Sequence, residues 1–305
     1  MAINSPIQRD VGIYIHVPYC RTLCPYCDFV KQRSRGQAPE VFTDALIREI
    51  DAYDGPALAQ SVFFGGGTPS LLAQRALERI FAALHRRFTF AGKTEVTLEA
   101  NPDDVSRDLA KTWLDLGINR ISLGVQSFHE ATLRYLGRRH DAAGALRACE
   151  TIASRFDNWN LDLIFGAPPI EHWPDTLART VALRPPHVAT YGLTYETGTP
   201  FERRRDQAVD DETWLRLYQQ AEEALGDYDH YEISNLARPG FQSRHNLIYW
   251  HNEEYAGFGT GAYSFLGGVR ARNHATIDAY LAAPGEKEEC LGLTEREIML
   301  ETIIQ

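Results

Sequence analysis

The sequence predicts an α/β fold: a partial (β/α)6 TIM-like barrel, followed by an α+β extension and the start of a truncated C-terminal domain. Three observations support this prediction. Short apolar runs alternate with amphipathic helical patterns at intervals of about thirty residues, the size of one βα unit. Polar and glycine-rich motifs follow the apolar runs, as they do at the active face of parallel barrels. The rhythm breaks after Leu193, so six units are expected.

Six strands are expected, each followed by a helix, in the parallel arrangement that βα repeats produce. The strands are placed at Gly12–Val17, Ser61–Phe64, Glu95–Glu99, Arg120–Val125, Asn160–Phe165 and Val188–Leu193. The clearest helices are Ser70–Phe88 and Asp211–Leu225, because their apolar residues fall on one stripe at helical spacing. Both stripes are interpreted as faces that pack on the core.

We predict three parts along the chain. Residues 9–235 form the barrel, residues 236–285 an extension that closes it, and residues 286–305 the beginning of a helical C-terminal domain. A strand-like stretch (Tyr228–Ser234) and a glycine-rich segment (Gly257–Gly268) follow the barrel without another βα repeat. Tyr195–Phe201 and Gly257–Tyr263 are assigned to loops that close the barrel mouth. The final residues, Glu295–Gln305, have an amphipathic helical pattern without a capping residue, so the last domain is expected to be truncated.

Composition limits the classes of function. Lys and Arg number 31 against 41 Asp and Glu, a formal net charge of −10, and the one basic block is Arg203-Arg204-Arg205. Because binding to a phosphate backbone needs a basic surface, nucleic acid is not an expected partner. No apolar run reaches the roughly 18 residues of a membrane-spanning helix. The start of the chain lacks an apolar signal segment, and five cysteines are too few for a disulfide framework. We therefore expect a cytoplasmic protein, which could still contact a membrane at its periphery.

Cys20-x3-Cys24-x2-Cys27 directly follows the first predicted strand. Three thiolates are one ligand fewer than a closed cluster site requires, so a cubane iron–sulfur cluster held here would keep one iron open. Structural zinc is the alternative, but zinc prefers four ligands in two separated pairs, and the chain has no second pair. The sequence therefore favours an iron–sulfur site over a zinc-stabilised barrel without redox chemistry.

Further polar motifs are expected at the same face as the cysteines. Gly65-Gly66-Gly67-Thr68 follow the second strand, Glu99 and Gln126 follow the third and fourth, and Asp162 lies along the fifth. Bare glycine N–H groups at a helix start can bind a charged ligand, and a buried carboxylate favours a bound hydroxyl or cation. Each motif also has a plainer explanation, such as a tight turn or a solvated strand end. Their coincidence on one face carries the prediction of a site.

Several motifs resemble a known family. Tyr14-Ile15-His16-Val17-Pro18-Tyr19-Cys20, with Cys24-Pro25-Tyr26-Cys27-Asp28-Phe29 and Gly65-Gly66-Gly67-Thr68-Pro69, resembles the radical S-adenosylmethionine (SAM) superfamily, in its coproporphyrinogen-dehydrogenase-like branch. The resemblance continues through Gly124–Phe128, Leu136–His140 and Asp162–Gly166 and covers most of the chain. It implies a barrel of the radical SAM type.

The resemblance implies two cofactors. Cys20, Cys24 and Cys27 would bind a [4Fe-4S] cluster whose open iron is chelated by the amino and carboxylate groups of SAM, and an external electron donor would reduce the cluster. Reductive cleavage of SAM to a 5′-deoxyadenosyl radical is the chemistry that this arrangement implies. By the same resemblance, SAM would be bound by Tyr14, Gly66, Gly67, Thr68, Glu99, Gln126, Arg138, Asp162 and the backbone of Gly192.

Two functions occur in this branch. The coproporphyrinogen III dehydrogenases (oxidases), which decarboxylate propionate side chains, continue their cysteine motif as Cys-x-Cys, whereas here Asp28-Phe29 follow Cys27. The haem chaperones have Phe at this position and share Tyr231–Ala237 and His245-Asn246-Leu247-Ile248-Tyr249-Trp250 with this chain. The resemblance therefore favours a haem chaperone, with porphyrinogen oxidation as the alternative.

A haem site is expected around His245. Neutral imidazole suits haem iron, and Tyr249 and Trp250 offer flat apolar surface to a macrocycle. From the residues alone, the alternative is that His245 caps a loop and the two aromatic residues fill core. His16, near the cysteines, could also ligate a metal or bind a propionate. The implied partners are haem, recipient haemoproteins that include membrane-associated respiratory ones, and the electron donor.

Overall fold

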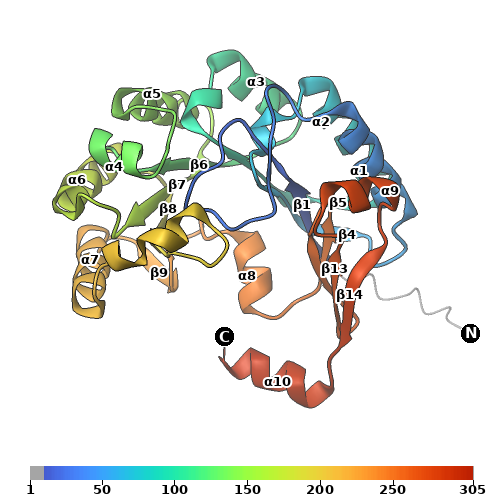
Figure 1. Cartoon of the computed structure of the whole chain (residues 1–305). Helices are drawn as coiled ribbons and strands as arrows, with labels where there is room; N and C mark the ends of the chain where they lie inside the picture. The colour runs from blue at the N-terminus through green and yellow to red at the C-terminus, as the bar shows by residue number, and fades with distance from the viewer. Residues whose placement is uncertain (1–9, 305) are drawn as a thin grey trace, which may run out of the picture.

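The computed structural model describes residues 10–304, and six parallel strands occupy the middle of its main sheet (Figure 1). In sheet order these strands are β1 (Asp10–Val17), β4 (Leu58–Gly66), β5 (Thr89–Ala100), β6 (Arg120–Gln126), β7 (Asn158–Phe165) and β8 (His187–Gly192). All six predicted strands are confirmed, and their spatial order follows the sequence. The predicted barrel start at residue 9, the segment before it and residue 305 lie outside the described residues.

A helix follows each of these strands and packs on the outer face of the sheet (Figure 1). These helices are α1 (Glu40–Ala52), α2 (Gln74–Arg87), α3 (Arg107–Asp115), α4 (Glu130–Tyr135) with α5 (Ala142–Ala153), α6 (Trp173–Leu183) and α7 (Asp211–Ala224). The helix predicted at Ser70–Phe88 begins later than expected, after a short 3-10 turn at Pro69–Leu71. The carbonyl of Leu71 accepts the N–H of Ala38 at 3.1 Å instead of continuing a helix.

The strands alternate between an apolar outer face and a polar inner face, and this alternation creates the site. In β1, Val11, Ile13 and Ile15 are fully buried beneath the helices. The residues between them face the barrel interior, where Tyr14 OH lies 3.0 Å from His16 Nδ1. Successive side chains of a strand point to opposite faces, so an apolar run interrupted by polar residues predicts a covered outer wall and a polar interior.

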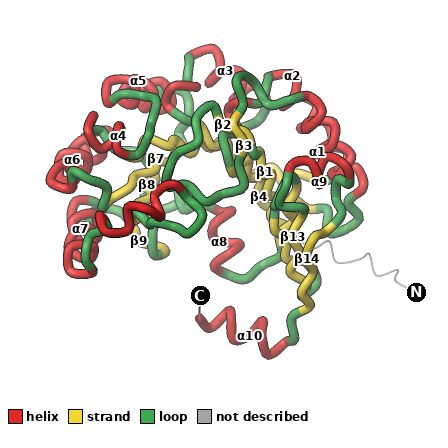
Figure 2. The backbone as a smooth tube through the Cα atoms, in the orientation of Figure 1, coloured by secondary structure: helices red, strands yellow, loops and turns green. Residues whose placement is uncertain are grey.

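The barrel is partial, as predicted, because the sheet continues at both ends without closing. Beside β1 lie β11 (Tyr255–Phe258), β12 (Tyr263–Leu266), β13 (Val269–Asn273) and β14 (Lys287–Gly292), and beside β8 lie β10 (Asn235–Ala237) and β9 (Asp229–Glu232). Helix α8 (Arg244–Trp250) connects the two ends and lies in the gap between them (Figures 1 and 2). Residues 257–263, expected as a loop, therefore include the end of β11 and the first residue of β12, and both strands are paired on both sides within the sheet.

Beyond β13 the chain forms α9 (Ile277–Ala282), β14 and α10 (Glu295–Ile304), the last of which matches the helix predicted at the end of the chain. A small two-stranded sheet, β2 (Tyr19–Cys20) with β3 (Gln32–Arg33), closes the neck of the cysteine loop. The predicted boundaries at 235/236 and 285/286 fall within a chain whose strands join one continuous sheet, and they stay predictions.

Candidate functional site

A cavity of about 360 Å³ opens at the carboxyl ends of the parallel strands. It is lined by residues that come from the cysteine loop and from the ends of β4 to β8. Among them are Cys20, Cys24, Cys27, Gly66, Gly67, Thr68, Glu99, Gln126, Arg138, Asp162 and Gly192. The structure thus brings together every predicted cluster and SAM residue except Tyr14. Contiguous motifs meet here because the ends of parallel strands share one edge of the sheet.

The cysteine loop connects β1 to α1 and presents its three free thiols to this cavity. Cys20 is buried, and Cys24 and Cys27 are half-buried. Burial raises the pKa of Cys20 to about 11 and also raises the pKa of Cys27, against the nearby Lys31 ammonium. Thiols of this kind lose their protons when a metal binds them. The donor set is therefore three soft sulfur ligands beside open space.

Arg138, from the loop after α4, joins the cysteine loop to the barrel wall. Its Nη1 lies 3.4 Å from Cys24 Sγ, and its Nη2 donates to the carbonyl oxygen of Gly124 at 2.7 Å and to Asn101 Oδ1. A guanidinium beside a sulfur stabilises the thiolate form. Sequence reasoning assigned Arg138 to SAM, and its contact with a cysteine appears only in the structure.

Two carboxylates face the same cavity. Glu99 Oε2 accepts the N–H of Gly66 at 3.1 Å, which links the glycine motif to the end of β5. Burial, and then the neighbouring Asp162, raise the pKa of Glu99 to about 8, while the Gly66 N–H and Arg120 oppose the shift. Burial likewise raises the pKa of Asp162. Two neighbouring buried carboxylates are difficult to ionise unless a ligand compensates their charge. They therefore suit a ligand that carries positive charge and hydroxyl groups.

A chain of buried hydrogen bonds supports Asp162 from below. Asn160 Nδ2 donates to Asp162 Oδ1 at 2.6 Å, and Ser122 Oγ donates to Oδ2 at 3.2 Å. Asn160 Oδ1 lies 2.6 Å from His187 Nδ1, and His187 Nε2 lies 2.7 Å from Tyr231 OH. Sequence reasoning missed these supporting residues. The available signal was their spacing, because Asn160 precedes Asp162 by two positions and therefore shares its face of the strand.

Gln126 is held in an unusual backbone conformation at the cavity wall. Its φ is +67°, and the pairing of β6 with β7 shifts register between Gly124 and Gln126. A positive φ is costly for a residue with a side chain, and such strain gathers at functional sites. The bulge directs the strand end toward the cavity, which Gln126 lines.

Tyr14 and His16 lie behind the cavity wall. The Tyr14 hydroxyl is 3.0 Å from His16 Nδ1, and His16 Nε2 lies 2.7 Å from the carbonyl oxygen of Val30, in the return arm of the cysteine loop. Both ring nitrogens of His16 are therefore occupied, and burial lowers its pKa. In this conformation His16 holds the cysteine loop and is not free to act as a ligand. Tyr14 supports the site from behind, through His16 and through its ring, which lies against Gly65 of the glycine motif.

The predicted haem residues lie at the base of the barrel, away from the cavity. His245 is 1% exposed, with Nδ1 2.8 Å from Ser61 Oγ and Nε2 2.8 Å from Tyr249 OH. Its ring stacks on Phe63 at 5.1 Å between centroids, and burial, then Arg120, lower its pKa to about 3. None of His245, Tyr249 and Trp250 lines the cavity. This arrangement matches the core-packing alternative, and haem ligation by His245 stays a prediction.

Comparisons with known proteins identify the family. A model of the radical SAM superfamily matches residues 14–180. A protein named heme chaperone HemW from Lactococcus lactis is 36% identical over 291 residues, which cover 92% of this chain and 76% of that protein. The chain belongs to the HemW family of radical SAM proteins. The HemW protein of Escherichia coli is 37% identical over 262 residues, covering 83% of this chain and 69% of that protein.

Solved structures agree with this HemW-family fold. Coproporphyrinogen III oxidase (HemN) from Escherichia coli, described as a radical SAM enzyme, superposes with a TM-score of 0.86 over 97% of this chain and 75% of that chain. Its sequence identity is 23%, so the likeness concerns the fold alone. Between residues 10 and 304, none of the helices is long and apolar enough to span a membrane.

Proposed function

We propose that this protein is a haem chaperone that binds haem and passes it to recipient haemoproteins. The observation that carries the proposal is its similarity to proteins named heme chaperone HemW, which are 36% and 37% identical over 92% and 83% of the chain. The side chain of Phe29, next to the cavity, is 63% exposed and stands where porphyrinogen-oxidising relatives continue their cysteine motif. Recipient haemoproteins and an electron donor are the proposed protein partners.

The residues around the cavity fit a [4Fe-4S] cluster and SAM. Cys20, Cys24 and Cys27 would hold the cluster, since all three line one cavity and three thiolates leave one iron of a cubane open. When bound, the cluster supplies one-electron reduction and an open iron for the amino and carboxylate groups of SAM. Arg138 would stabilise the thiolate of Cys24, which its guanidinium contacts at 3.4 Å.

The polar wall of the cavity would position SAM. Gly66, Gly67 and Thr68 would meet its methionine end, and the backbone of Gly192 its adenine. Glu99 and Asp162 would meet its positively charged and hydroxyl groups, because their buried carboxylates are poorly compensated without a ligand. Gln126 and Arg138 complete the set. Tyr14 would contribute indirectly, by holding His16 against the cysteine loop.

Haem ligation by His245 requires a different conformation of α8. Both ring nitrogens are paired, and the side chain is 1% exposed, so an iron can reach it only if the helix leaves the barrel base. Withdrawal of the helix would also remove His245 from its stacking contact with Tyr14, at 6.2 Å between centroids. Haem binding through His245 would therefore loosen a residue that supports His16.

The test is an anaerobic titration with haem. Protein reconstituted with iron and sulfide should bind haem with saturation, and it should leave coproporphyrinogen III unchanged under reducing conditions. Cys24→Ser should lose the cluster and retain haem, which would separate the two sites. Absence of saturable haem binding, or formation of a porphyrinogen with two vinyl groups, would overturn the proposal.

A second variant tests the ligand. If His245 binds the iron, the haem absorption bands of His245→Ala should differ from those of the wild type, and the affinity should fall. Unchanged bands and affinity would assign His245 to the core of the barrel base. Tyr218→Phe is a suitable control, since it alters a half-buried aromatic residue of α7 outside the cavity.

A further inference from the structure

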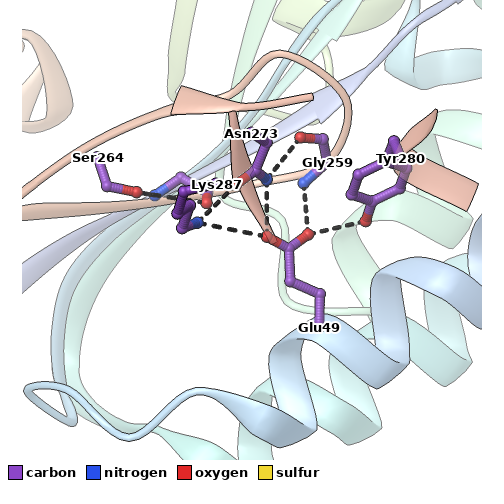
Figure 3. Close-up of polar contacts among 7 residues, drawn as sticks. Glu49, Gly259, Ser264, Asn273, Tyr280 and Lys287 are labelled. Atoms are coloured by element: carbon purple, nitrogen blue, oxygen red, sulfur yellow. Dashed lines mark hydrogen bonds and ion pairs between the residues drawn. The ribbon is translucent and has the colours of Figure 1, made fainter. Parts of the chain in front are cut away.

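A buried carboxylate on α1 gathers donors from the end of the chain. Glu49 is 4% exposed and lies outside the cavity. Its Oε2 accepts the N–H of Gly259 and the hydroxyl of Tyr280, each at 2.8 Å, and its Oε1 accepts Asn273 Nδ2 at 2.7 Å (Figure 3). Lys287 Nζ lies 3.7 Å from Oε1. All of these partners are donors, so both oxygens of Glu49 act as acceptors. Burial raises the pKa of the carboxyl, and the donors oppose that shift.

Glu49 holds both backbone polar groups of Gly259, one directly and one through Asn273. The N–H of Gly259 donates directly to Glu49, and its carbonyl oxygen accepts Asn273 Nδ2 at 2.8 Å, while the same amide donates to Glu49 (Figure 3). Gly259 has a φ of +96°, and a Cβ there would collide with the carbonyl oxygen of His16. The carboxylate therefore fixes a closely packed segment against the strand that leads to the cysteines.

The same segment packs on the cysteine loop two residues later. A Cβ on Gly261, whose φ is +69°, would lie 2.8 Å from Val30 Cγ2. The carbonyl oxygen of Val30 lies 2.7 Å from His16 Nε2, and Val30 comes three residues after Cys27. Residues 259–261 thus fill the space between Glu49 and the return arm of the loop.

We propose that Glu49 is a positioning residue for the cysteine loop, acting through residues 259–261. The carboxylate fixes this segment, and the segment holds Val30 and His16 in the places that keep the loop closed around its thiols. Tyr280, by contrast, bonds the same carboxylate from α9 through its hydroxyl. Its ring packs on Phe42, which contacts Tyr19 at the neck of the cysteine loop, and Tyr280→Phe keeps that ring. Loss of the hydroxyl alone should therefore loosen only the end of the chain. The two roles of Glu49 can be separated on this basis.

The experiment measures thiol reactivity in the full, reduced chain. It uses a Cys290→Ser background, because Cys290 is exposed, whereas Cys149 is buried and should react slowly. In Glu49→Gln the new side-chain amide is a donor and must face one of the donors that now bind Glu49. Because this conflict should loosen the segment and the loop, the loop cysteines should react about tenfold faster with an aromatic disulfide reagent. After anaerobic loading, iron release to a chelator should accelerate similarly. Tyr280→Phe is the matched control and should change neither rate more than about twofold.

The reaction rates are compared at temperatures that lie equally far below the unfolding temperature of each variant. Equal reaction rates in Glu49→Gln and the parent, or an equal rise in Tyr280→Phe, would overturn the proposal. If Glu49→Gln does not fold, Asn273→Ala removes the bond to the Gly259 carbonyl and should give the same faster reaction. The inference rests on the proposed cluster site, but the thiol rates need no cofactor. If the cluster assignment is wrong, none of the variants will take up iron, but Glu49→Gln will still show faster thiol reaction than the parent and Tyr280→Phe.

Discussion

Gly66 offers a sharp test of how the glycine motif shapes the site, by substitution with alanine. Its φ is +107°, and a Cβ there would lie 2.5 Å from Cε1 and 2.6 Å from Nδ1 of His16. Gly117 is the matched control, because its φ is +93° and a Cβ there would meet nothing within 4 Å. Both substitutions therefore carry the backbone cost, and only Gly66→Ala adds a steric one.

The magnitudes follow from this geometry. A positive φ costs an L-residue about 1–2 kcal/mol, which is the whole effect expected for Gly117→Ala. Overpacking adds about 1–3 kcal/mol. If His16 moves, its bond to Val30 is lost as well, for about 1 kcal/mol. With all three contributions, we expect Gly66→Ala to be destabilised by roughly 3–6 kcal/mol and Gly117→Ala by roughly 1–2 kcal/mol.

Urea unfolding of the two variants and the parent, at one pH and without cofactors, measures these differences. Iron content after anaerobic reconstitution gives a second readout, which should fall in Gly66→Ala and stay unchanged in Gly117→Ala. Equal losses of unfolding free energy in the two variants would refute the reasoning, since the contact with His16 would then be energetically irrelevant. A displaced His16 with normal iron content would refute its role in holding the loop.

Three further predictions concern single side chains. The pKa of Glu99, about 8 in the fold against an ordinary 4.5, means that the folded chain binds a proton that the unfolded chain has lost, so this contribution to stability falls as pH rises from about 4.5 to 8. Across that pH range, urea unfolding should show that the unfolding free energy of the wild type falls relative to that of Glu99→Gln. His245→Phe keeps the stacking but leaves Ser61 and Tyr249 unpaired, and should lower the unfolding free energy by about 2 kcal/mol. Arg138→Gln removes the guanidinium that lies 3.4 Å from Cys24 Sγ, so the iron content after anaerobic reconstitution should fall below that of the wild type, and an unchanged content would contradict this role.

Much of the fold and site follows from local pattern. The six strands and their order could be predicted because each apolar run is short and is followed by a helical stripe. The cavity residues could be predicted because each belongs to a contiguous motif at a strand end. The strands β11, β12 and β13 were missed, since they are short and the turns between them are rich in glycine. Their pairing depends on partner strands that cannot be identified from the local sequence.

The sequence by itself determined the six βα units, the three-cysteine loop and the family, because periodicity and motif spacing are properties of neighbouring residues. Only the tertiary structure decided that His245 is enclosed at the barrel base and that Tyr14 stands behind His16. It also revealed that Glu49 receives a hydrogen bond from Gly259, 210 positions later. Burial and hydrogen-bond partners arise from contacts between distant segments, and no local pattern in the sequence records those contacts.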